Sequence, residues 1–335
     1  MTLTQLRYIV SIVDCGLNIT AAAARIHATQ PGISKQLKQL EGELGFQVFS
    51  RRGKSLQTIT PAGQQVVARA RVILDEARSI RSLAANLRGD DRGALTIVTT
   101  HTQARFVLPA ILGEFRRHHP RVALHLRPHA DAHVLEQFAQ GKADLAMLSS
   151  SSPSSPSCGV AVPLYRWSRT VLVLKADPLA RLRRPLRLED LASRPLVSYD
   201  SSLRPDSSLW RAFDNRGLRP QFACTSSDAD LIKTYVRAGL GVGILAEMAV
   251  QDGDAADLSV LDARELLPEC TTWLLLGRDQ VLRRHTLALV QQLAPWIDSR
   301  DLQAALEGSV TEPVWPQPPH WRDLVSRPQC VRALA

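Results

Sequence analysis

The clearest alternation of apolar and polar positions lies in Gln30–Glu41. Apolar residues recur there every three or four positions, which predicts a helix with one buried stripe. Pro31 fits, because the first-turn amides of a helix have no internal partner. The stripe consists of Ile33, Leu37, Leu40 and Leu44. The opposite face carries Gln30, Ser34, Lys35, Gln36, Lys38 and Gln39, which suits a nucleic-acid groove, although a solvated amphipathic helix has the same pattern.

Two helical patterns precede this stretch. Residues 3–13 repeat apolar positions at helical spacing, and Gly16 ends that helix. Thr20 has the residue type of an N-cap for a short alanine-rich helix over 21–26. Residues 27–29, with His27 as a turn residue and not a ligand, form a tight connection. The pattern predicts a helix-turn-helix.

A predicted β-hairpin follows the third helix, which Gly45 ends. Residues 47–50 and 56–59 are two short strand-like runs around a cationic tip. The tip contains Arg51, Arg52 and Lys54. Beside a helix-turn-helix, such a hairpin indicates a wing that meets phosphates or a minor groove, whereas the alternative is a solvated loop.

A long helix is predicted from Thr60-Pro61 to about Arg88, because a capping hydroxyl followed by proline marks a helix start. About 28 residues at ~1.5 Å each give a rod of ~40 Å. A rod with so narrow an apolar seam favours self-association. The seam, spaced alternately by four and three, is Val66, Ala70, Ile73, Ala77, Ile80, Ala84 and Leu87.

From residue 91 the pattern changes to alternating strands and helices, which predicts an α/β domain with parallel sheets and ligand sites at strand carboxyl ends. Residues 149–157 form a low-complexity serine loop, and 301–335 an irregular tail without periodicity. The expected strands are 95–98, 122–126, 145–148, 170–174, 196–199, 221–224, 243–246 and 273–276. The expected helices are 106–115, 134–140, 229–238 and 285–296.

Charge and composition indicate what kind of partner the chain binds. The chain of 335 residues has a net charge of +9, and residues 1–90 hold 12 Lys and Arg against 6 Asp and Glu. A basic N-terminal module indicates an acidic polymer, most simply nucleic acid. Five cysteines without CxxC spacing, no membrane span and no signal-like start favour a cytoplasmic protein. The sequence contains no Gly-x-Ser-x-Gly motif, Walker loop or pair of catalytic carboxylates, so no motif predicts an enzyme.

Several segments together resemble the LysR-type transcriptional regulators, and within them the CysB-like branch that activates sulfur assimilation. The N-terminal motif lies in Thr29–Gln36, Leu40-Glu41 and Thr60–Gly63. In the body, 99–105 is similar to that branch's ligand loop, and 228–243 to its second-subdomain signature.

The resemblance implies an α+β multi-domain protein. Its parts are a winged helix-turn-helix over 1–60, a linker helix over 61–90 and a periplasmic-binding-protein-like effector domain over 91–300. Two α/β subdomains, 91–165 with 270–300 and 166–269, close on an effector such as sulfate or acetylserine. The partners are promoter DNA, further copies of the chain as a dimer of dimers, and RNA polymerase. No membrane, metal or cofactor is expected.

On this resemblance, the third helix reads base edges through Gln30, Ser34, Lys35 and Gln36, beside Thr29 and Pro31. The expected phosphate contacts are Lys38, Arg51, Arg52 and Lys54.

Thr100, Thr102 and Gln103 lie between a strand and a helix start, where free amides and hydroxyls suit an anion. The alternative is that these hydroxyls only cap the helix. Ser149, at the end of the third strand, is expected to face the same cleft.

The loop Asp200–Pro205 departs from the CysB-like pattern, which is rich in hydroxyls and contains glycine. Ser202 remains as a donor, while Arg204 suits a sulfonate or carboxylate and Asp200 repels a bare anion. A regulator of another pathway, such as sulfonate use, is therefore the alternative function. A solute-binding protein without DNA activity would explain the body but not the basic N-terminus.

Two further groups of residues are weaker candidates, one for a metal site and one for a redox sensor. His125, His129 and His133 flank Asp131, but a strand and a loop do not give them the spacing of ligands on one helix, so no metal site is expected. Cys158 has no neighbour that would stabilise a thiolate, which disfavours a redox sensor.

Overall fold

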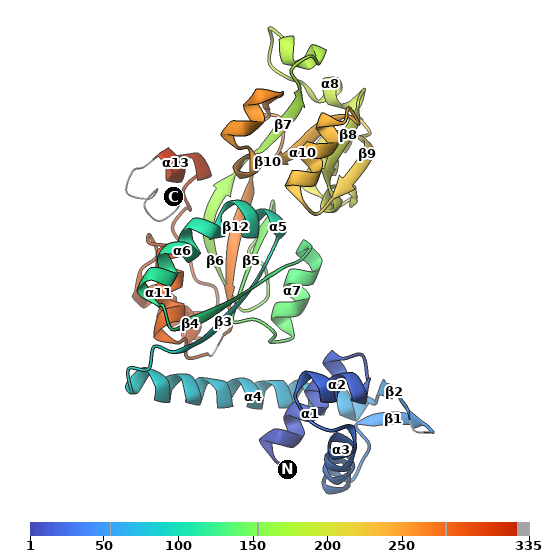
Figure 1. Ribbon diagram of the computed structural model, residues 1–335, viewed down its shortest axis with the longest axis vertical. Helices are drawn as coiled ribbons and strands as arrows, with labels where there is room; N and C mark the ends of the chain where they lie inside the picture. Colours follow the sequence, from blue (N-terminus) through green and yellow to red (C-terminus); the bar gives the residue numbers. More distant parts are fainter. Residues whose placement is uncertain (54, 153, 279, 327–335) are drawn as a thin grey trace. The chain divides into compact units, whose positions relative to one another are not determined.

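The computed structural model describes residues 1–53, 55–152, 154–278 and 280–326. The chain divides into two units (Figure 1): Met1–Asp90 with Gln280–Arg283, and the remainder from Asp91 onward. Residues 280–283, predicted as part of the effector domain, instead belong to the first unit. There the Val281 amide donates to Ser79 and the Leu282 carbonyl accepts from Asn86.

Three helices form the helix-turn-helix: α1 (Leu3–Asp14), α2 (Ile19–Arg25) and α3 (Gln30–Leu44). The cap of α2 is Asn18 and not Thr20, because the Asn18 side chain accepts from the Ala21 amide at 2.9 Å. His27 adopts a left-handed φ of 53°, as a turn residue does. The fully buried residues of these helices include Ile9, Ile12, Ile33, Leu37 and Leu40.

The wing is an antiparallel hairpin of β1 (Phe49–Arg52) and β2 (Ser55–Ile59). The predicted strands are shifted, because β1 continues through Arg51 and Arg52 and only the turn at Gly53 interrupts the pairing. Arg52 pairs with Ser55 in the register. Two of the three cations expected at the tip therefore belong to a strand.

The long helix α4 (Pro61–Leu87) begins as predicted, with Thr60 as N-cap. Gly63 is required there, since a Cβ would lie 2.0 Å from the Val48 carbonyl oxygen. The predicted seam is divided. Its N-terminal part joins the helix-turn-helix core through Ala70, beside the buried Val67. Farther along, Ile73, Ile80 and Leu87 are 39, 61 and 79% exposed.

The second unit contains two five-stranded mixed sheets. The first has the order β4-β3-β5-β12-β6, and only β3, β4 and β5 are parallel, so the parallel pairing predicted for these three strands is confirmed, while β12 and β6 add antiparallel pairs to the sheet. Strand β6 was not predicted. The bounds are β3 Gly93–Thr99, β4 Val122–Pro128, β5 Leu145–Ser150, β6 Val160–Trp167 and β12 Cys270–Leu276.

The second sheet has the order β11-β7-β10-β8-β9, and again combines parallel and antiparallel pairs. Strand β11 was not predicted. The chain crosses between the sheets at Ser168 and between Asp262 and Cys270. The bounds are β7 Arg169–Leu174, β8 Pro195–Tyr199, β9 Gln221–Ser226, β10 Val242–Ala246 and β11 Leu258–Asp262.

Helices cover both sheets (Figure 1). The helix predicted over 106–115 corresponds to α6, and a separate short helix, α5, ends just before it because Pro109 has no amide hydrogen to continue the turn. The helices around the first sheet are α5 His101–Phe106, α6 Leu108–His118, α7 Asp131–Ala139 and α11 Arg284–Leu293. Those of the second sheet are α8 Leu188–Ala192, α9 Ser208–Asp214 and α10 Ala229–Arg237.

The prediction of an irregular tail from 301 is wrong for two helices, α12 (Ser299–Leu306) and α13 (Trp321–Ser326). The segment between them has no regular structure after Gly308 but is held by specific contacts. The Trp315 indole donates to the Ala161 carbonyl at 2.7 Å, and the Arg166 amide donates to the Pro319 carbonyl at 2.9 Å. Leu324 is buried.

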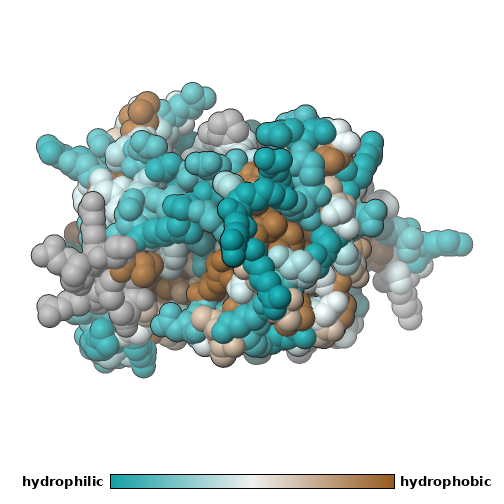
Figure 2. Space-filling model, turned by 90° about the horizontal axis from the view of Figure 1, so that it is seen from above, coloured by the Kyte–Doolittle hydropathy of each residue, from teal (hydrophilic) through white to brown (hydrophobic). Residues whose placement is uncertain are grey.

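Among the described residues no single helix is long and apolar enough to cross a membrane; α1 and α2 meet that criterion only together, and they are bent by 118°. Their apolar residues form the helix-turn-helix core. The face in Figure 2 is mainly hydrophilic, with apolar side chains in separate patches.

Candidate functional site

The recognition face of α3 carries the predicted DNA-contacting residues. Thr29 caps the helix through the Gly32 amide at 3.2 Å, and Gln30 donates to the Ser34 hydroxyl at 3.2 Å. Ile33, Leu37 and Leu40 bury the opposite face. The face is therefore polar and open to a groove. Its exposed members are Thr29, Gln30, Pro31, Lys35 and Lys38, with Ser34 and Gln36 half-buried.

The wing cations differ in how they are held. Glu41, buried on α3, accepts from the amides of Val48 and Phe49 at 2.9 and 3.3 Å and from Arg51 at 3.2 Å. Arg51 is thus tied to the recognition helix. Arg52 is exposed and has no partner within the described part of the wing. The expected phosphate contact Lys54 lies outside the described residues.

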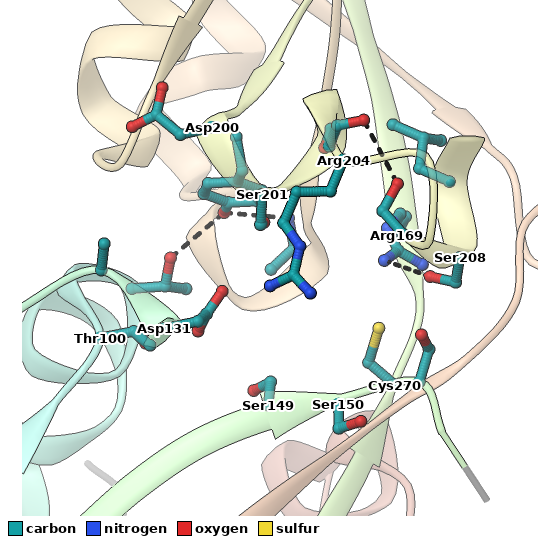
Figure 3. A pocket seen from close by; sticks show the side chains of 18 of the residues that line it. Thr100, Asp131, Ser149, Ser150, Arg169, Asp200, Ser201, Arg204, Ser208 and Cys270 are labelled. Carbon is teal, nitrogen blue, oxygen red and sulfur yellow. Dashed lines mark hydrogen bonds between the residues drawn. The ribbon is translucent and has the colours of Figure 1, made fainter. Parts of the chain in front are cut away.

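The second unit contains a cavity of about 360 Å³ between its two sheets (Figure 3). All six predicted effector residues line it: Thr100, Thr102, Gln103, Ser149, Ser202 and Arg204. Thr100 precedes α5 but its hydroxyl makes no capping bond. The capping alternative therefore does not hold for Thr100 in the part of the chain that the structure describes.

Gln103 forms the back wall of the cavity. It is 1% exposed, donates to Ser149 at 3.4 Å and to Thr272 at 3.3 Å, and accepts from the Tyr165 hydroxyl. The Trp167 indole also donates to Thr272, at 3.1 Å. Because these bonds occupy the Gln103 amide, its role is to fix the wall rather than to offer a free donor.

The loop after β8 supplies the opposite wall. Ser202 is 5% exposed and its hydroxyl lies 3.0 Å from that of Ser198, which donates to the Ile244 carbonyl. Arg204 binds Asp206 through two bonds of 3.0 and 2.6 Å. Ser202 therefore shapes the loop, while the Arg204 side chain reaches into the cavity (Figure 3).

Tyr199, at the end of β8, joins the two walls. Its hydroxyl accepts from Thr102 at 3.2 Å and from the Ala246 amide at 3.2 Å. Burial raises the pKa of this phenol, so the group stays neutral. The sequence prediction did not include Tyr199, since nothing in the sequence shows that it lies beside a threonine 97 positions earlier.

Charged residues of the cavity, among them Arg169 and Asp131, were also absent from the predicted effector site. Arg169, which begins β7, donates to Ser208 at 2.8 Å and to the Pro268 carbonyl at 2.8 Å. Asp131, which begins α7, faces the Arg204 guanidinium across the cavity (Figure 3). Burial raises the pKa of the Asp131 carboxyl to about 6, although Arg204 and Arg169 act in the opposite direction.

No group of three metal-ligand side chains occurs within the residues that the structure describes. His125 belongs to β4, His129 follows that strand, and His133 lies on α7. Cys158 is half-buried, and burial raises the pKa of its thiol, which opposes a reactive thiolate.

A winged helix-turn-helix and a two-lobed unit with a cavity between its lobes define a class of proteins, the ligand-responsive transcriptional regulators. Family models agree. Residues 3–64 match the bacterial regulatory helix-turn-helix protein, lysR family, and residues 88–297 match the LysR substrate binding domain. The chain belongs to the LysR family of DNA-binding transcriptional regulators.

Named relatives support the same assignment. The chain is 39% identical to the HTH-type transcriptional regulator CysB of Haemophilus influenzae over 295 residues, which are 88% of this chain and 90% of that protein. It is 34% identical to SsuR of Burkholderia cenocepacia over 92% of this chain and 100% of that one. The cofactor-binding domain of the Cbl transcriptional regulator superposes with a TM-score of 0.60 at 34% identity, covering 65% and 94% of the two chains.

These findings confirm the predicted LysR-type regulator with a CysB-like resemblance and set aside the solute-binding alternative. The family and its named members are regulators and not enzymes. Regulators of this family bind promoter DNA and a small effector and form oligomers.

Proposed function

We propose that this regulator activates genes of sulfur assimilation and that a small sulfur-linked anion, such as sulfate or an acetylserine, occupies its cavity. The observation that carries the proposal is that one cavity is lined by the Thr100 hydroxyl, which makes no capping bond, and by the guanidinium groups of Arg169 and Arg204. Hydroxyl and guanidinium donors complement sulfate and carboxylate oxygens. The CysB-like resemblance supplies the sulfur connection.

A second candidate is a regulator of sulfonate use. Arg169 and Arg204 favour it, because a guanidinium can bind two oxygens of a sulfonate side by side. The two candidates differ only in the effector and in the genes controlled.

On the DNA side, we propose that Gln30, Ser34, Lys35 and Gln36 contact base edges and that Lys38 and Arg52 contact phosphates, with Thr29 and Pro31 at the start of the same helix. The exposure of Gln30, Lys35, Lys38 and Arg52 supports these roles, and Ser34 and Gln36 lie half-buried on the same polar face of α3. The active form is a cytoplasmic dimer of dimers that contacts RNA polymerase at the promoter.

Thermal unfolding of the full-length protein tests the effector. Sulfate, thiosulfate, O-acetylserine, N-acetylserine and ethanesulfonate are added separately at millimolar concentration. A ligand with micromolar affinity then adds about 4 kcal/mol to the free energy of unfolding. Thr100→Val is expected to weaken that ligand about tenfold, since one hydrogen bond to a charged group is lost.

Thr311→Val, at an exposed threonine outside the cavity, is the control and leaves the stabilisation unchanged. If none of the five compounds stabilises the protein, the sulfur proposal is wrong while the family assignment stands.

A further inference from the structure

The effector cavity carries both signs of charge in equal number. Three arginines and three aspartates line it, so their formal charges cancel. They are Arg169, Arg204, Arg211, Asp131, Asp200 and Asp206. A cavity built for a bare dianion would carry an excess of positive charge or neutral donors alone. A balanced lining instead complements a ligand that carries both charges.

Asp131 is the carboxylate in this set that lacks a partner. Asp206 is bound by Arg204 through two hydrogen bonds, and Asp200 is exposed at the rim. Asp131 forms no hydrogen bond or ion pair with the described residues, and its carboxylate points into the cavity (Figure 3). Its acceptor oxygens are therefore available to a ligand.

A purely structural role does not explain that orientation. Asp131 is the first residue of α7, where an acidic side chain favours the helix through its dipole. However, Ala130 occupies the N-cap position and no side chain caps this helix. The Asp131 carboxylate therefore does not accept hydrogen bonds from the first amides of α7. Burial raises the pKa of the Asp131 carboxyl because its charged form is poorly solvated there.

The donor for an anionic group lies on the opposite wall. Arg169 is held in place by Ser208 and the Pro268 carbonyl, and in Figure 3 it lies across the cavity from Asp131 and Thr100. Asp131 and Arg169 come from different subdomains but line one cavity. A small ligand with an ammonium at one end and an oxyanion at the other can contact both sides at once.

We propose that the effector is a zwitterion, an α-amino acid or an aminosulfonate, whose ammonium group binds Asp131 and whose anionic group binds Arg169. The inference rests on the proposed function in taking this cavity as the effector site, and it narrows the chemical class of the effector. Asp131 then acts as the specificity-determining residue that selects against a simple anion.

The test compares pairs of ligands in which one member carries a free ammonium group and the other does not. Titration calorimetry on the full-length protein uses 2-aminoethanesulfonate against ethanesulfonate, O-acetylserine against N-acetylserine, and alanine against propionate. We expect the ammonium-bearing member of at least one pair to bind tenfold or more tightly than its partner. Asp131→Asn is expected to abolish that ratio.

Asp200→Asn is the matched control, since it removes a carboxylate from the rim of the same cavity. It leaves the ratio unchanged. Equal or tighter binding of the ammonium-free members, or the loss of the ratio in Asp200→Asn alone, overturns the inference. Thermal unfolding without ligand confirms that both variants fold.

The outcomes separate the inference from the proposed function. If anions bind without any zwitterion, the zwitterion inference fails and the sulfur function stands. If alanine alone binds and depends on Asp131, the inference stands and the sulfur function fails. If no compound of either class binds, both fail.

Discussion

Single residues decide which wing cations are available to DNA. Glu41 lies under the wing and collects two backbone amides and Arg51, so this guanidinium serves the fold as well as any ligand. Arg52 has no such anchor. Charge alone made the two arginines equivalent in the sequence, and only the tertiary position of Glu41 distinguishes them.

The two arginines are therefore predicted to respond differently to alanine. Arg52→Ala lowers the slope of log affinity against log salt by about one, because one phosphate contact is lost. Arg51→Ala lowers the free energy of unfolding by about 1–2 kcal/mol, because Glu41 keeps its burial without its cationic partner. Fluorescence anisotropy measures the salt slope, at salt concentrations from about 50 to about 200 mM. Urea unfolding measures the change in the free energy of unfolding. An unchanged slope in Arg52→Ala would contradict the phosphate contact.

At the scale of elements, the helices with strong local signals were predicted well. For α3, the stripe, the Thr29 cap and the stop at Gly45 agree with the structure. The strands β6 and β11 and the helix α13 were missed. Strand β6 contains Pro163 and follows a serine-rich loop, so its sequence shows no clear alternation, although almost every residue in it is buried.

The C-terminal segment shows how tertiary contacts replace local signals. It has no periodicity, yet the Trp321 ring packs on Tyr165 at 5.2 Å between centroids. Tyr165 in turn donates to Gln103 in the cavity wall. Arg322 binds Glu247 at 2.6 Å, and Glu247 accepts from the Ser168 amide at the crossing between the sheets. This segment thus supports both the cavity and the crossing.

Removing the Trp321 ring is predicted to weaken both the cavity wall and the crossing between the sheets. Trp321→Ala lowers the free energy of unfolding by about 2 kcal/mol, less than a fully buried tryptophan would, since this ring is half-buried. It also weakens effector binding by loosening Tyr165 and Gln103. Val314→Ala, at a side chain 95% exposed in the same segment, is the control. Equal urea midpoints for the two variants would show that the segment carries no stability.

At the scale of the whole molecule, α4 leaves apolar side chains without cover. Val72, Ile80 and Leu83 are 61, 61 and 49% exposed in the single chain. One face of a long helix with several such residues is a surface for another copy of the chain. Regulators of this family form oligomers, and α4 is the surface that we propose for this contact.

Ile80→Asp is predicted to dissociate the oligomer, because a charge at the centre of this apolar surface would be buried without a partner. Sedimentation velocity measures the change in mass, and DNA affinity falls with the loss of paired half-sites. Gln65→Asp, at an exposed α4 position outside the seam, keeps the oligomer. A monomeric wild type, or an Ile80→Asp variant of unchanged mass, would contradict an α4 interface.

The sequence by itself determined the parts of this protein that depend on near neighbours. The spacing of Ile33, Leu37 and Leu40, the caps at Thr29 and Thr60, and the stop at Gly45 act within one or two helical turns, so the sequence displays them directly. The winged helix, the linker helix and the family followed from such local signals.

Only the tertiary structure decided what the cavity offers a ligand. Thr102 meets Tyr199 across 97 positions, and Gln103 meets Thr272 across 169. These distant partners decide whether a polar group is hydrogen-bonded within the protein or can bind a ligand. For that reason the sequence predicted residues that line the cavity but not its balance of charges, and Asp131 could be proposed as a binding group only once both subdomains were in place.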